Sequence, residues 1–192
     1  MSQPGPGGGN ALEVALRYAI EAAEQVTPQM LPLPTPCRGW DLRMLLLHAS
    51  DSVAALTEGF EGGHVGQTGP DGDQMDPADP AGEFGRRAQQ LLGSSALIAR
   101  VDGVVTVSGC PMRASLMATA GALELAVHGW DIAQTCGGGP PIPAPLALDL
   151  LRAAPLLITR ADRQQLFAEP VAASSDASPG DRLAAYLGRL AL

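Results

Sequence analysis

Apolar residues recur every three or four positions near the start of the chain, which is the spacing of one face of an α-helix. This first helix is predicted to begin at Asn10, which can cap it, with Glu13 placed to complete a capping-box-like pair. Pro28 follows the pattern and ends it. The repeating positions are Leu12, Leu16, Ala19, Ala23 and Val26.

A longer apolar stripe predicts a second helix from about Trp40 to Phe60, with His48 on the shoulder of the stripe. A polar loop over residues 61–77 should follow. Asp79 is then a cap followed by a proline in the first turn, so a third helix is predicted to begin there. The short β-branched segment 103–107 is predicted to be an extended link or one of a pair of strands.

The segment from about Met112 to Cys136 is apolar over most of its circumference, which is typical of a central, buried helix. Gly137 to Gly139 end it, and a fifth helix is predicted over about residues 144–159. A last short helix should begin at Ser178, with Asp181 in its first turn. The pattern as a whole predicts an all-α helix bundle.

Composition supports this assignment, because the chain is 46% hydrophobic but only 4% aromatic and is dominated by the helix formers Leu and Ala. Its 192 residues suit one domain, predicted over residues 10–192 behind a disordered Pro/Gly-rich tail at 1–9. The net charge of −8 argues against a nucleic-acid partner. The absence of a basic run, of a long apolar stretch and of signal-peptide features argues against a membrane partner and predicts a cytoplasmic protein.

The three cysteines have no CxxC spacing, so they are predicted to be reduced thiols. A small buried packing residue is the favoured interpretation of each, although Cys37 follows a Pro-Thr-Pro run and could be a nucleophile. The other two are Cys110 and Cys136.

The candidate chemistry lies on the central helix, where Glu124 and His128 are four residues apart and therefore point the same way, with Asp131 three residues further on. A buried carboxylate and imidazole need a partner. Either both groups bind a divalent metal ion, with zinc favoured, or the Glu124 carboxylate and the His128 imidazole simply hydrogen-bond to each other. His48 is a better third metal ligand than His64, which lies in the Gly-rich loop. Three protein ligands would leave a position for water or substrate, as in catalytic zinc sites.

Three stretches resemble the DinB-like superfamily, and within it the mycothiol-dependent maleylpyruvate isomerase N-terminal-domain branch. They are Pro34 to Arg43 followed by His48, Glu124 to Ala133, and Phe167 to Arg189. The resemblance implies a four-helix bundle with additional short helices and a short strand pair. It also implies a divalent metal ion, often zinc, bound by His48, Glu124 and His128.

The function implied by the resemblance is metal-dependent activation of a low-molecular-weight thiol for S-transfer to, or isomerisation of, a small electrophilic metabolite. Mycothiol is the implied thiol for an actinobacterial protein, and the Arg-only basic residues fit such a GC-rich source. Asp131 would orient His128 or a neighbouring arginine, or it is simply a helix-end charge beside Trp130. Arg43 would pair with Asp131 or bind a substrate carboxylate, although a plain surface arginine is the favoured interpretation.

Two alternatives stay open: a metal-dependent cyclase or hydrolase of a biosynthetic pathway, and a non-enzymatic metal-binding stress protein. The isomerase has a second domain with no counterpart in this sequence, so maleylpyruvate isomerisation itself is not expected. Bundles of this kind often form homodimers, which leaves the oligomeric state open.

Overall fold

The computed structural model describes residues 8–66, 78–94, 102–158 and 167–189. Residues 1–7 of the predicted disordered tail lie outside these ranges, so most of the tail stays a prediction. Gly8 and Gly9 already belong to the first helix, which begins two residues before the predicted start at Asn10. Asn10 is therefore a residue of the first turn and not the predicted cap.

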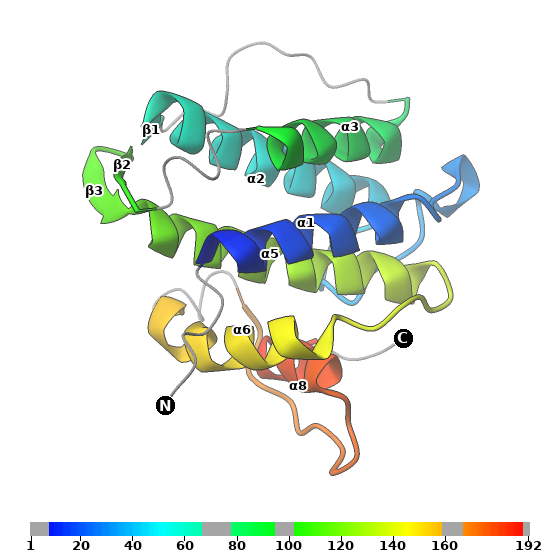
Figure 1. Cartoon of the computed structure of the whole chain (residues 1–192). Helices are drawn as coiled ribbons and strands as arrows, with labels where there is room; N and C mark the ends of the chain where they lie inside the picture. The colour runs from blue at the N-terminus through cyan, green and yellow to red at the C-terminus, as the bar shows by residue number, and fades with distance from the viewer. Residues whose placement is uncertain (1–7, 67–77, 95–101, 159–166, 190–192) are drawn as a thin grey trace.

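Four helices form a bundle, which confirms the predicted helical fold. Each helix packs against two others: α1 against α5 and α3, and α2 against α3 and α5. The contact between α1 and α5 is the most extensive (Figure 1). The four helices are α1 (Gly8–Ala23), α2 (Leu42–Gly62), α3 (Pro80–Gly93) and α5 (Ala114–Thr135).

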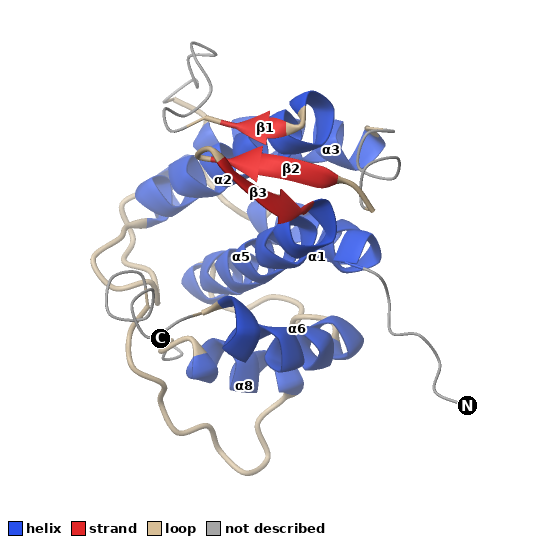
Figure 2. Cartoon of the chain, turned by 90° about the vertical axis from the view of Figure 1, so that its left-hand side faces the viewer, coloured by secondary structure: helices blue, strands red, loops and turns tan. Residues whose placement is uncertain are grey.

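Helices α6 (Ala144–Leu157) and α8 (Pro179–Tyr186) pack against each other on the side of α5 that faces away from α2 and α3 (Figures 1 and 2). Because neighbours cover α5 on both sides, most of its residues are buried. This burial explains why its sequence is apolar around most of the helix. A one-turn 3-10 helix, η1 (Pro28–Met30), follows α1.

A small three-stranded sheet covers one end of the bundle (Figure 2). Strands β2 (Val104–Val107) and β3 (Cys110–Arg113) form the predicted strand pair, and β1 (His64–Val65) joins β2 in parallel. The two residues between β2 and β3 have positive φ angles, 49° at Ser108 and 81° at Gly109, as a tight hairpin turn requires. The strand β1 was not predicted; it forms where a polar loop was expected.

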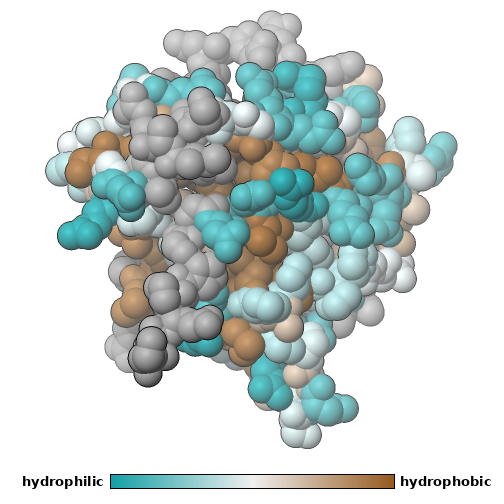
Figure 3. All heavy atoms as spheres, in the orientation of Figure 1, coloured by the Kyte–Doolittle hydropathy of each residue, from teal (hydrophilic) through white to brown (hydrophobic). Residues whose placement is uncertain are grey.

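Local signals placed most helix ends correctly. The side chains of Asp79 and Ser178 accept backbone hydrogen bonds from Gly82 and Asp181 at the starts of α3 and α8, as predicted. Helix α2 begins two residues later than predicted, because Asp41 caps it and leaves Trp40 in the preceding loop. No helix within the described ranges has the length and apolarity needed to cross a bilayer. Hydrophilic side chains cover the region of α3 in Figure 3, with apolar ones visible along the middle of that face.

Candidate metal centre

A cavity of about 340 Å³ lies where the loop before α2, helices α2 and α5, and the C-terminal segment meet. Its volume is within the usual range of small-molecule sites. The lining residues are Cys37, Arg38, Trp40, His48, Glu124, His128, Phe167 and Arg189.

The loop before α2 is held closed by its own hydrogen bonds. Pro34 and Asp41 form an isolated β-bridge, and the Thr35 amide donates to the Trp40 carbonyl over 3.1 Å. The Thr35 hydroxyl donates to the carbonyls of Cys37 (3.2 Å) and Trp40 (3.0 Å). Because the loop is fixed in this way, the Trp40 ring has a defined place against the imidazoles of the cavity.

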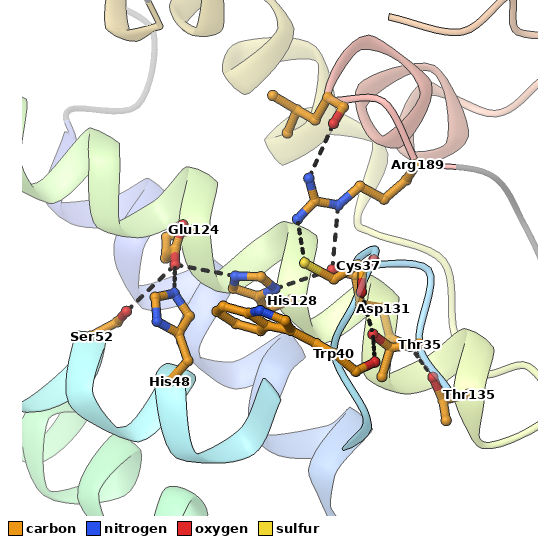
Figure 4. Close-up of polar contacts among 11 residues, drawn as sticks. Thr35, Cys37, Trp40, His48, Ser52, Glu124, His128, Asp131, Thr135 and Arg189 are labelled. Atoms are coloured by element: carbon orange, nitrogen blue, oxygen red, sulfur yellow. Dashed lines mark hydrogen bonds and ion pairs between the residues drawn. The ribbon is translucent and has the colours of Figure 1, made fainter. Parts of the chain in front are cut away.

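Two imidazoles and one carboxylate converge in the cavity (Figure 4). The Nε2 atom of His48, from α2, lies 2.5 Å from Oε1 of Glu124 on α5. The Nε2 atom of His128, one turn further along α5, lies 3.2 Å from the same oxygen. The Trp40 ring stacks on His128 at a centroid distance of 6.0 Å and meets His48 edge-on at 4.7 Å. The structure thus brings together the three ligands proposed from the sequence.

The other ring nitrogen of His128, Nδ1, lies 3.1 Å from Oδ2 of Asp131, which is fully buried. The position of Asp131 fits its expected part in orienting His128. The arginine beside it is Arg189, whose Nε lies 3.5 Å from the same carboxylate oxygen. Arg43 is half-buried and is not among the described residues that line the cavity, so nothing in the geometry supports a substrate contact for it.

Glu124 and His128 form an ion pair when no metal is bound, with the His128 ring buried and the Glu124 side chain 31% exposed. Burial alone would raise the pKa of Glu124, but the charges and hydrogen bonds of His128 and His48 outweigh it and hold that pKa well below its usual range. Burial alone would also lower the pKa of His128. The Glu124 charge and the Asp131 hydrogen bond outweigh this effect and raise the pKa of His128 to about 9.

The donor set fits a divalent ion. The three ligand atoms lie within 4.8 Å of one another, and two imidazoles with a carboxylate suit Zn²⁺ and other first-row ions. Ligands of a tetrahedral zinc ion are roughly 3.3 Å apart, close to the 3.2 Å between His128 and Glu124. The 2.5 Å contact between His48 and Glu124 is a hydrogen bond that would have to lengthen. The contact of His128 Nδ1 with a buried carboxylate is typical of histidines that ligate metals.

A second group of potential ligands, Cys37, His128 and Asp131, lies beside the first. Here the Arg189 guanidinium is already in place, 3.5 Å from the Cys37 sulfur and 3.5 Å from the Asp131 carboxylate. A metal ion would have to displace this cation. Burial also raises the pKa of the Cys37 thiol, which disfavours the thiolate that a metal requires. The set of His48, Glu124 and His128 is therefore the better metal site.

The remaining candidates lie elsewhere. His64 is exposed in β1, with its Nε2 3.6 Å from Glu58. Cys110 is exposed at the start of β3, so its predicted role as a buried packing residue is wrong. The hairpin turn at Ser108 and Gly109 places it at the surface. Cys37 and Cys136 are half-buried.

Sequence reasoning did not identify Phe167 and Arg189 as cavity residues. The available signal is the stretch from Phe167 to Arg189 that resembles the family, since these two residues are its ends.

Comparison with protein-family models gives a match. The family model described as the mycothiol maleylpyruvate isomerase N-terminal domain matches residues 12–133, which is 122 of the 192 residues. Neither the comparison with curated proteins nor that with solved structures found a match. The matched range contains the three proposed metal ligands and Asp131, and the family resemblance noted in the sequence is thereby confirmed. The chain belongs to the mycothiol maleylpyruvate isomerase N-terminal domain family.

Proposed function

We propose that this protein is an enzyme that binds a divalent metal ion, with zinc favoured, through His48, Glu124 and His128. It uses the ion to activate a small thiol for S-transfer to, or isomerisation of, an electrophilic metabolite. The observation that carries the proposal is the convergence of two imidazoles and a carboxylate on the wall of a cavity, with His128 backed by the buried Asp131.

The residues around the ligands have distinct parts in this proposal. A bound divalent ion supplies Lewis acidity, which favours the thiolate form of a thiol that coordinates it. Asp131 accepts a hydrogen bond from Nδ1–H of His128, which leaves the lone pair on Nε2 free for the metal. Trp40 packs against both imidazoles and restricts their rotation.

The choice of thiol rests on the family. Its name refers to mycothiol, which supports a mycothiol-like thiol as the co-substrate. A wholly structural metal site is less well supported, because structural zinc sites have four protein ligands. Three converge here, on the wall of a cavity that a small molecule can enter.

Cobalt substitution tests the proposal directly. Co²⁺-loaded protein should develop a thiolate-to-metal charge-transfer absorption when mycothiol or N-acetylcysteine is added. The band should be absent in His48→Ala and unchanged in His64→Ala, the matched control, since His64 is exposed outside the cavity. Bound cobalt whose spectrum does not respond to any thiol would exclude thiol activation at this centre.

A further inference from the structure

The guanidinium of Arg189 is buried in the wall of the cavity. Its side chain is only 7% exposed, yet it lines the cavity together with the proposed metal ligands. It donates from Nη1 to the Leu187 carbonyl over 3.1 Å and from Nη2 to the Cys37 sulfur over 3.5 Å. Figure 4 shows the group held between these partners and Asp131, above His128.

The Arg189 guanidinium has N–H donors that no protein group in the described part of the chain uses. An arginine side chain carries five N–H donors, and these two hydrogen bonds use two of them. The Nε atom is buried and lies 3.5 Å from the Asp131 carboxylate, too far for a hydrogen bond, so it is not a donor that a ligand in the cavity can reach. The donors left for a ligand are the second N–H of Nη1 and the second N–H of Nη2, and an acceptor placed against either would be favoured.

The charges around the cavity point to an anion. Arg38, on the loop before α2, is exposed and also lines the cavity. The one carboxylate among the described lining residues is Glu124, which already faces two imidazoles. Two guanidinium groups therefore border this cavity in a chain whose net charge is −8, and the buried Asp131 behind the lining balances only the charge of Arg189. Such a local excess of positive charge attracts anionic ligands.

We propose that Arg189 binds a carboxylate of the substrate, with Arg38 at the rim adding to the attraction. A planar guanidinium with free N–H groups matches a carboxylate. The carboxylate belongs either to the electrophile or to the thiol. Arg189 lies outside residues 12–133, so the family match assigns it no role. The inference rests on the proposed function only in identifying this cavity as the substrate site.

Succinate and its neutral diamide, succinamide, test this proposal by isothermal titration calorimetry. We expect the EDTA-treated protein to bind succinate and not succinamide. Arg189→Gln should weaken succinate binding by about tenfold or more, the value of a charge-assisted hydrogen bond. Arg38→Gln should weaken it less, because Arg38 is exposed. Arg152→Gln on α6 is the matched control, since Arg152 is exposed and pairs with Asp149, and it should leave binding unchanged.

Two further variants guard against loss of the fold, because Arg189→Gln leaves Asp131 buried without its cation. Asp131→Asn/Arg189→Gln removes both charges and should also fail to bind succinate. Arg189→Lys keeps the charge but not the forked geometry, so it should bind with intermediate affinity. Circular dichroism verifies that each variant is folded.

The proposal is overturned if folded variants without Arg189 bind succinate as the wild type does, if succinamide binds equally well, or if succinate binds only after metal is restored. Binding in EDTA does not depend on metal or thiol, so failure of the proposed function would leave this result intact. A titration with N-acetylcysteamine, a thiol without a carboxylate, distinguishes the two sources. If N-acetylcysteamine and succinate bind at the same time, the carboxylate that Arg189 binds belongs to the electrophile. If N-acetylcysteamine competes with succinate, that carboxylate belongs to the thiol.

Discussion

Metal binding at this centre should release a proton from His128. In the metal-free protein the pKa of His128 is raised to about 9, so at neutral pH its imidazole is protonated. A metal ion can bind only the neutral ring, so the proton must leave first. Glu124 contributes no proton, because its pKa is held well below the usual range and it is already ionised.

The magnitude follows from the pKa of His128. Below pH 9, each unit of pH changes the neutral fraction of His128 by about tenfold, or about 1.4 kcal/mol of binding free energy. Between pH 6 and pH 8 the apparent affinity for Zn²⁺ should therefore rise by about a hundredfold from His128 alone.

Calorimetric titration of zinc in two buffers with different ionisation enthalpies measures this effect. The difference between the observed enthalpies should correspond to about one proton released from His128 per ion near pH 7.5. Asp131→Asn should release less, because Asp131 helps to raise the pKa of His128. Zinc binding without proton release, at an affinity that does not change with pH, would refute this account of the charges.

Three further predictions concern the protein without added ligand. In EDTA, the ion pair between His128 and Glu124 stabilises the fold fully at pH values below 6.5, the pKa of His128 in the unfolded chain. This contribution is lost as the pH rises through about 9, the pKa of His128 in the folded protein, so the melting temperature should fall over this interval. A melting temperature that stays constant would argue against the ion pair. Gly129→Ala should destabilise the protein by about 1–3 kcal/mol, less the gain in helix propensity, because the new Cβ would lie 2.9 Å from the Tyr18 ring. The control is Gly85→Ala in α3, where the new Cβ meets nothing within 4 Å, and it should stabilise the protein by up to about 1 kcal/mol. Chemical denaturation compares these two variants, and equal effects would contradict the close packing of α1 against α5. Cys110 should react with a thiol reagent faster than Cys37 and Cys136, because Cys110 is exposed and burial raises the pKa values of the other two thiols. Mass spectrometry identifies the labelled residue. Labelling of Cys37 or Cys136 before Cys110 would be inconsistent with the structure.

Much of the fold could be predicted from sequence because its signals are local. The capping residues Asp79 and Ser178 act on amides three positions away, so their effect depends little on the rest of the chain. Helix α5 is apolar around most of its surface, which predicted its central place. The strand β1 could not be predicted in this way, since His64 pairs with Thr106 across a long separation and the strand has only two residues.

The residues of the candidate site likewise include some that local sequence patterns predict and some that only the tertiary fold brings together. Glu124 and His128 lie one turn apart, so helical periodicity alone predicted that they point the same way. His48 was selected from only three histidines, and the resemblance supported the choice. The contact of Arg189 with Cys37 spans 152 residues and depends on how α8 packs against the bundle. No periodic pattern encodes such a contact, and Arg43 was proposed in its place.

Metal analysis of the purified protein tests the central claim most directly. After loading with zinc and dialysis, the wild type and His64→Ala should each retain about one ion per chain, as a single site with three protein ligands predicts. His128→Ala should retain almost none, because it removes one ligand and leaves Glu124 without its closest α5 partner. Equal metal content in His128→Ala and the wild type would contradict the account.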